Sequence, residues 1–149
     1  AAAAHRRQMN GLFFTLDYTK ADVVERLKAI NGVSVSVEGD TSDEICAEHI
    51  IKRLRRAQGA SIAVIDYLQL LDQRRSTPDL DQQLAALKKH AAKSGDIIVA
   101  ISQIDRAFEM SGKTLPDLSD IRLPNPVDLT RFTRTCFLHE GVVAFNEAG

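Results

Sequence analysis

Two kinds of hydrophobic pattern follow each other along this chain. The first is a short, nearly continuous run of apolar residues. Such runs occupy residues 11–16 (GLFFTL), 61–66 (SIAVID) and 97–102 (IIVAIS). Runs of this length are typical of strands buried on both faces of a parallel sheet. Residues 33–37 (VSVSV) alternate instead, which predicts a strand with one drier face. Residues 135–145 (TCFLHEGVVAF) predict two further strands that turn at Glu140-Gly141.

Between these runs the spacing of apolar residues becomes that of amphipathic helices. The pairs Thr19/Asp22 and Thr41/Glu44 each have the spacing of a capping box, which predicts the start of a helix. The helix expected after the second pair would gather its apolar side chains on one side, at positions 47, 50, 51, 54 and 57. A third amphipathic segment spans residues 80–93 and ends at a Ser-Gly pair.

Strands that alternate with helices predict an α/β fold with a mainly parallel sheet. In such folds, ligands bind beyond the carboxyl ends of the strands. This rule places Asp17, Asp66 and the Ser102-Gln103 pair along one edge, which we call the rim. A long loop over residues 106–126 carries three of the four prolines, and its length is typical of a functional loop.

Composition narrows the class of protein without deciding it. Residues 1–149 suit a single domain, with 44% hydrophobic residues, 26% charged residues and a formal net charge of −1. No bulk basic charge enforces binding to nucleic acid or membrane, and no apolar run has the roughly 20 residues of a membrane span. Cys46 and Cys136 have neither metal nor redox spacing, which indicates reduced residues of a cytoplasmic protein.

The segment AFEMSGKT (residues 107–114) comes within one residue of the phosphate-binding pattern G-x-x-x-x-G-K-[ST]. Ala107 stands where the first glycine is required. A working phosphate loop follows a strand directly and opens a helix, whereas this segment comes five residues after Ser102 and leads into a proline-containing stretch. The segment is therefore interpreted as a polar loop.

A stronger signal is IAVIDYLQLL (residues 62–71), in which an apolar strand ends in a carboxylate at Asp66. A magnesium-nucleotide enzyme needs such a carboxylate to hold the metal or its water shell. The segment VIDYLQLL resembles the Walker B segment of DnaB-type replicative helicases, which belong to the RecA-like ATPase family. Three further segments resemble that family in order and spacing: LFFTLDYT (12–19), VAISQIDRAFE (99–109) and PDLSDIR (116–122). The resemblance implies a RecA-like three-layer fold, with a mainly parallel sheet and helices on both faces.

The resemblance also implies roles for individual residues. Asp66 would hold the shell of a magnesium ion that accompanies ATP, with Ser102 beside the nucleotide. Asp17 would take the place of the base that orients the attacking water, and Gln103 would sense the γ-phosphate. Two loops, 73–79 and 106–120, would face a channel for single-stranded DNA in a hexameric ring of identical subunits. The candidate phosphate contacts are Arg74, Arg75, Arg106 and Lys113.

Two departures from the family pattern change what is expected of this chain. The phosphate-binding loop is missing, so the chain resembles a DnaB core that is truncated before or through that loop and inactive alone. Asp17 stands where the family has glutamate, and the shorter side chain withdraws the carboxylate by roughly 1 Å, a misplacement that can cost about 100-fold in rate. Both departures leave open a non-catalytic RecA-like adaptor or loader that binds a helicase or recombinase. A response-regulator-like module with Asp66 as phosphoacceptor is a third hypothesis, but paired acidic residues near the first strand are lacking.

Overall fold

The computed structural model describes residues 9–31, 37–123 and 125–147. Its main sheet contains four parallel strands in the order β2-β1-β3-β4. Their bounds are β1 Asn10–Thr15, β2 Val37–Asp40, β3 Ser61–Asp66 and β4 Ile97–Ile101. A separate antiparallel pair follows, formed by β5 (Arg134–His139) and β6 (Val142–Glu147). The predicted mainly parallel sheet is confirmed.

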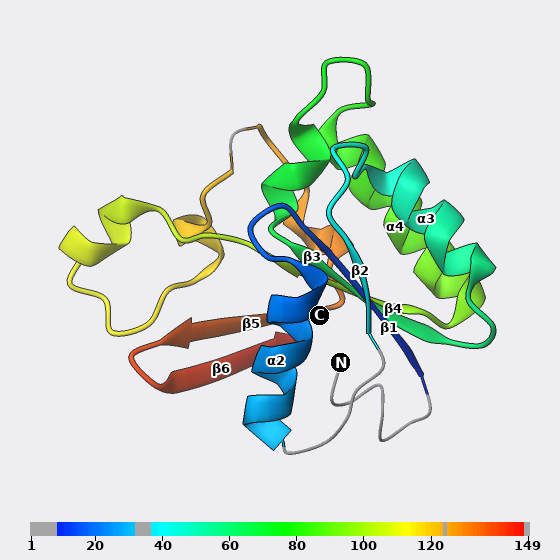
Figure 1. The fold of residues 1–149 in the computed structure, drawn as a ribbon. Coiled ribbons are helices and arrows are strands. Elements are labelled where there is room, and N and C mark those ends of the chain that lie inside the picture. The colour runs from blue at the N-terminus through cyan, green and yellow to red at the C-terminus, as the bar shows by residue number, and fades with distance from the viewer. Residues whose placement is uncertain (1–8, 32–36, 124, 148–149) are drawn as a thin grey trace.

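Helices cover both faces of the main sheet. Their bounds are α2 Lys20–Asn31, α3 Ala47–Arg56 and α4 Leu80–Ser94. Figure 1 shows α3 and α4 side by side on one face and α2 on the other, which confirms the three-layer arrangement. In the described part of the chain, no helix is both long enough and apolar enough to cross a membrane.

Alternation along β1 explains how one strand serves both layers. Leu12 and Phe14 are buried in the main core, which is formed against α3 and α4. Phe13 points to the opposite face and packs with Val23 of α2 and Val37 of β2. Burying apolar surface stabilises the fold by about 25 cal/mol per Å², so both layers hold the strands that carry the rim.

Local sequence signals fix two helix starts and one helix end. The Thr19/Asp22 capping box is confirmed, since the backbone N–H of Thr19 donates to Asp22 Oδ2 (2.9 Å) and that of Asp22 donates to Thr19 Oγ1 (3.3 Å). Asp79 caps α4 by accepting from the N–H of Gln82 at 2.8 Å. Gly95 ends α4 with a φ of 76°, a left-handed conformation that glycine adopts without steric cost.

The capping box predicted at Thr41/Glu44 is wrong. Helix α3 begins at Ala47, and its N-cap residue Cys46 makes no side-chain cap. The amide oxygen of Gln83, on α4, accepts the hydrogen bond from the N–H of Ala47 at 3.0 Å. The cap therefore comes from a neighbouring helix instead of the residues that precede α3.

The two edge strands of the main sheet differ from the strands that the sequence predicts there. The alternating strand at 33–37 lies outside the described residues except for Val37, at which β2 begins. The expectation that the third apolar run is buried on both faces is wrong for one face. Ile98 and Ala100 pack on the main core, but the other side of β4 is 40–43% exposed at Ile97, Val99 and Ile101. On that side α2 lies against β2, at the opposite edge of the sheet from β4.

The predicted turn between β5 and β6 is confirmed. Glu140 and Gly141 connect the two strands with φ values of 46° and 82°. Positive φ at both central residues is typical of the two-residue turns that match the twist of a hairpin.

Candidate functional site

The carboxyl ends of β1, β3 and β4 meet at one edge of the sheet. In the parallel register Thr15 pairs with Asp66, and Asp66 pairs with Ile101. The residues that follow these strand ends therefore lie along the same edge, which Figure 1 shows beyond the tips of the parallel arrows. The rim predicted from Asp17, Asp66 and Ser102-Gln103 is confirmed as an arrangement of the chain.

Asp66 and Asp17 place two carboxylates within electrostatic reach of each other. Burial raises the pKa of Asp66 above its usual value, and the negative charge of Asp17 raises it further. Asp17 itself is exposed, and its backbone N–H donates to Oγ1 of the buried Thr15 at 3.0 Å. That bond holds the backbone of Asp17 just after the end of β1, close enough to Asp66 for its charge to act on that carboxyl.

Ser102 and Gln103 continue the rim beyond β4. The Ser102 hydroxyl is buried and has no hydrogen-bond partner among the described residues. Buried hydroxyls normally have a partner, so this one has a free donor and acceptor at the end of β4. Gln103 is exposed, and its backbone oxygen accepts from the N–H of Arg122 at 2.9 Å.

The donor set of the rim fits a magnesium ion held through water. Magnesium prefers oxygen ligands and is usually held by one or two carboxylates together with waters and substrate phosphates. Among the described residues, no group of three or more His, Cys, Asp or Glu side chains could hold a metal. Two carboxylates that repel each other and raise a pKa are what a divalent cation would relieve. Of the described residues at the rim, Asp66 and Asp17 are therefore the ones that could hold such an ion.

The described residues do not fit the phosphate chain of a nucleotide in the same way. Gly112, Lys113 and Thr114 lie in the loop between two short 3-10 turns, η2 (Arg106–Met110) and η3 (Leu118–Asp120). No strand precedes them directly and no α-helix starts at them in this part of the structure. The interpretation of AFEMSGKT as a loop agrees with this placement.

The first candidate DNA loop, residues 73–79, is tied to the segment that precedes α3. Arg74 forms an ion pair with Asp43 at 2.6 Å, and the oxygen of Arg74 accepts from the Thr77 hydroxyl at 2.7 Å. Arg75 is exposed and forms no ion pair with another described residue. Of the two arginines, Arg75 thus has the side chain that is available to a ligand.

The second candidate loop contains Arg106 and Lys113, and the two differ in their surroundings. Arg106 is exposed and makes no ion pair within the described ranges 9–31, 37–123 and 125–147. The ammonium group of Lys113 is instead bound within its own loop, to Asp117 at 3.0 Å and Asp120 at 2.9 Å. No pattern in the sequence predicts this pairing, because it depends on the path of the loop.

Sequence reasoning also missed the residues that close the base of this loop. The side-chain amide of Gln69, which follows β3, donates to the backbone oxygen of Arg122 at 2.6 Å. Arg122 in turn lies against Gln103, with its guanidinium 3.4 Å from the Gln103 amide oxygen. These contacts connect the ends of β3 and β4 to the loop, and only the QL in YLQLL and the IR in SDIR mark them in the sequence.

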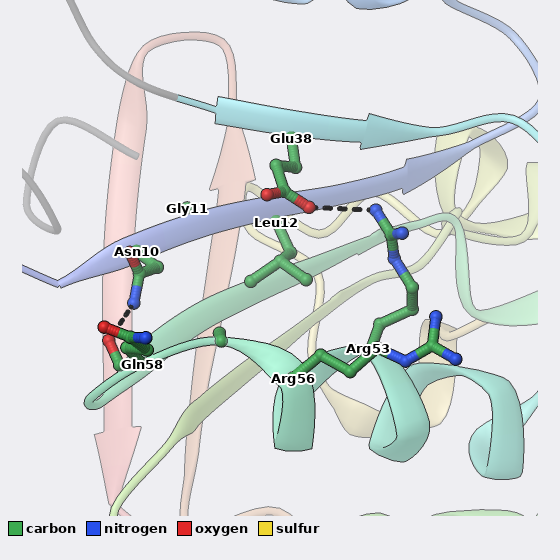
Figure 2. Close-up of a pocket in the computed structure, with 8 residues that line it drawn as sticks. Asn10, Gly11, Leu12, Glu38, Arg53, Arg56 and Gln58 are labelled. Carbon is green, nitrogen blue, oxygen red and sulfur yellow. Dashed lines mark hydrogen bonds and ion pairs between the residues drawn. The ribbon is translucent and has the colours of Figure 1, made fainter.

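A hollow of about 220 Å³ lies at the opposite end of the sheet. Figure 2 shows its wall, where Glu38 pairs with Arg53 (2.9 Å) and the Asn10 amide donates to the oxygen of Gln58 (2.7 Å). Asn10 begins β1 and Gln58 follows α3, so this hollow borders the amino ends of the strands. It is separate from the rim.

Comparison with known proteins gives this geometry a family. Over 75 residues the chain is 33% identical to the replicative DNA helicase DnaB of Leifsonia xyli subsp. xyli (strain CTCB07), in an alignment that covers 48% of the chain and 16% of that relative. A solved DnaB-like replicative helicase, studied with its interactions with primase, matches 78% of the chain and 37% of its own length, with a TM-score of 0.60 and 19% identity. A solved ATPase domain matches 78% of the chain and 55% of its own length, with a TM-score of 0.57 and 18% identity.

These likenesses confirm the RecA-like fold and favour a helicase core over the adaptor or loader hypothesis. The chain spans about one sixth of the curated relative it matches, at 16% of that length. The family described as DnaB-like helicase C terminal domain matches residues 18–127, which include Asp66, Gln103 and both candidate loops. The chain belongs to the DnaB-like helicase C-terminal domain family.

Proposed function

We propose that this chain forms the part of a DnaB-like helicase motor that couples a magnesium-nucleotide site to loops that bind single-stranded DNA. The observation that supports it best is the shared rim, where Asp17, Asp66 and Ser102-Gln103 meet at the carboxyl ends of three parallel strands. The base of the second loop joins this rim directly through Gln103 and Arg122. A DnaB-like helicase acts as a cytoplasmic replication protein and as a hexameric ring, and both are part of the proposal.

Asp66 would hold the water shell of magnesium, and the bound ion would supply positive charge against the phosphates. Asp17 would accept a hydrogen bond from the attacking water and orient it. The bond to Thr15 holds the backbone of Asp17, while no hydrogen bond from another described residue holds its exposed carboxylate, which is therefore available to a water. The unpaired Ser102 hydroxyl could donate to a phosphate oxygen or to a water of the shell.

The triphosphate itself needs donors that the described residues do not supply at the rim. Loops that cradle phosphates use several backbone N–H groups and a lysine. Lys113, the lysine of the only G-K-T sequence in the chain, is bound to aspartates within its loop. The proposed part of this chain in the reaction is therefore to hold magnesium and to couple the nucleotide site to the DNA loops.

For DNA, Arg75 and Arg106 are the proposed phosphate contacts, with Arg74 beside them. Arg75 and Arg106 are exposed and make no ion pair in the described part of the chain, whereas Arg74 already pairs with Asp43. Single-stranded DNA would be held mainly through its phosphates, because few aromatic side chains are available to stack on bases.

The test is the salt dependence of binding to a labelled oligonucleotide in the assembled full-length helicase. Arg75→Ala and Arg106→Ala should each weaken binding to every sequence and flatten the slope of log K against log salt by about 0.7 for each subunit that contacts the strand, the loss of one phosphate contact per subunit. Lys89→Ala is the matched control, because Lys89 is an exposed cation of α4, away from both loops. If the arginine variants keep the slope of the wild type, the two loops do not contact DNA.

A further inference from the structure

The loop between Gln103 and Arg122 is closed at its base by backbone hydrogen bonds. The N–H of Arg122 donates to the oxygen of Gln103 at 2.9 Å, and that of Asp105 donates to the oxygen of Asp120 at 2.7 Å. Ile104 and Ile121 face each other between these bonds as an antiparallel bridge. The loop thus leaves and rejoins the rim as a short two-stranded stem.

A second closure lies inside the loop and is centred on Lys113. Its ammonium nitrogen is 3.0 Å from Asp117 Oδ2, 2.9 Å from Asp120 Oδ2 and 3.3 Å from Ser119 Oγ. An ammonium group has three donors, so these contacts satisfy it. Asp120 is only 11% exposed at its side chain and also accepts from the N–H of Asp117 at 2.9 Å. We call Lys113, Asp117 and Asp120 the Lys113 clasp.

The titration behaviour of the clasp agrees with its geometry. Hydrogen bonds to Asp120 and then to Asp117 raise the pKa of Lys113. Hydrogen bonds from Ser119 and then from Lys113 lower the pKa of Asp117 to about 2. Lys113 and Asp117 are therefore both charged near neutral pH, and the clasp is closed under the conditions in which a helicase works.

Arg106 lies between the stem and the clasp in the sequence, and its backbone is held in a capped turn. Asp105 caps the turn η2 by accepting from the N–H of Ala107 at 2.9 Å, so Arg106 occupies the first position of a capped turn. Phe108 in the same turn is buried and lies edge-on to His139 of β5, with ring centroids 4.9 Å apart. The turn is thus fixed at both its start and its middle.

We propose that the Lys113 clasp holds this loop in one shape before any ligand binds, and that Lys113 and Asp120 are positioning residues for Arg106. This inference rests on the proposed function only in its last step, where Arg106 contacts DNA. It replaces the direct phosphate contact that sequence alone suggests for Lys113. The ion pairs of Lys113 with Asp117 and Asp120 would compete with DNA for its ammonium group. In this proposal the role of Lys113 is to form these ion pairs and so to hold the loop.

Asp120→Asn distinguishes a direct phosphate contact of Lys113 from a positioning role, because the two predict opposite changes in DNA affinity. If Lys113 contacts phosphate directly, removing the charge of Asp120 frees the lysine and removes a repelling group, so DNA should bind more tightly. If the clasp positions the loop, the same substitution loosens it, and DNA should bind less tightly. Amide hydrogen exchange of residues 104–121 should then rise about threefold to fivefold, as expected when an ion pair near the surface is lost.

Glu109→Gln is the matched control, because Glu109 is an exposed acid of the same loop that makes no ion pair with another described residue. It should leave the exchange of residues 104–121 unchanged. The charge swap Lys113→Asp with Asp120→Lys should restore part of the protection lost in Asp120→Asn, which a mere folding defect would not do. A thermal unfolding midpoint near that of the wild type shows that the variants are folded.

Unchanged exchange in both Asp120→Asn and Lys113→Met would overturn the clasp, and tighter DNA binding by Asp120→Asn would make Lys113 a direct contact. The exchange measurement needs no DNA, so it decides the clasp even if the wild-type protein fails to bind an oligonucleotide. That failure would instead count against the proposed function. The two ideas can therefore fail separately.

Discussion

Asp66 is a carboxylate whose surroundings disfavour its own negative charge. Burial first and the charge of Asp17 second raise its pKa, so the ionised form is disfavoured in the folded chain. Because the folded-state pKa lies above the unfolded one, ionised Asp66 opposes folding, and the stability that it costs returns as the pH falls through the raised pKa. A cation at the rim would reverse this preference.

We therefore predict that Asp17→Asn lowers the pKa of Asp66 without returning it to its ordinary value. The substitution removes the charge of Asp17 but leaves the burial, which is the larger cause. An NMR titration that follows the side-chain carboxyl carbon of Asp66 measures this directly. Asp43→Asn, an exposed acid on the loop before α3, is the control and should leave that titration unchanged. If the pKa of Asp66 were the same in Asp17→Asn and in the wild type, the two carboxylates would not interact at the rim.

At the scale of elements, α3 depends on a residue of α4 for its start. The Gln83 side chain, 2% exposed, accepts from the N–H of Ala47 and donates to the backbone oxygens of Leu71 and Pro78. One amide thus satisfies three backbone groups from three segments. Buried backbone groups without partners are costly, so this amide holds α3, α4 and the turn after β3 together.

Gln83→Leu should lower the free energy of unfolding by about 2–4 kcal/mol, because it keeps a similar volume but leaves buried backbone groups unsatisfied. Gln82→Leu is the control on the preceding residue. Gln82 is exposed, and among the described residues its side chain bonds only to Asp79, so the loss should stay below about 0.5 kcal/mol. Urea unfolding of both variants gives the comparison. Equal stability of the two would mean that Gln83 does not cap α3.

The contrast between α2 and α3 shows what the sequence could predict. Thr19 and Asp22 lie three residues apart and bond to each other, so a local pattern was enough to place the start of α2. The cap of α3 comes from Gln83, 36 residues after Ala47, and the pattern at Thr41/Glu44 is not used. Local pairs are visible in a sequence, whereas a cap supplied by another helix depends on the packing.

The candidate site divides in the same way into local patterns and long-range contacts. Apolar runs that end in Asp66 and Ser102 predicted the rim, because parallel strands present their carboxyl ends along one edge. The partner of Lys113 could not be predicted, since Asp120 is seven residues away along an irregular loop. The exposed face of β4 was also missed, because an apolar run does not show whether helices cover both of its sides.

For the whole molecule, charge is divided between the rim and the loops beyond it. Two repelling carboxylates, Asp17 and Asp66, lie at the rim, and two exposed arginines that make no ion pair in the described part of the chain, Arg75 and Arg106, lie on the two candidate loops. A cation alone meets a favourable field at the rim, but a polyphosphate meets acids and no cradle among the described residues. The chain should therefore distinguish between magnesium and the magnesium complex of ATP.

We predict that this chain alone binds the magnesium complex of ATP more weakly than about 100 µM, because magnesium would be held through few carboxylates and the described residues offer no cradle for the phosphates. Isothermal calorimetry with magnesium, ATP and their complex tests this. Asp66→Asn should weaken the binding of magnesium, and Lys113→Ala should change neither affinity, because Lys113 lies in the clasp. Micromolar affinity that Lys113→Ala abolishes would show that Gly112, Lys113 and Thr114 do cradle phosphate. Micromolar affinity that only Asp66→Asn abolishes would instead show that the rim binds the nucleotide without a cradle.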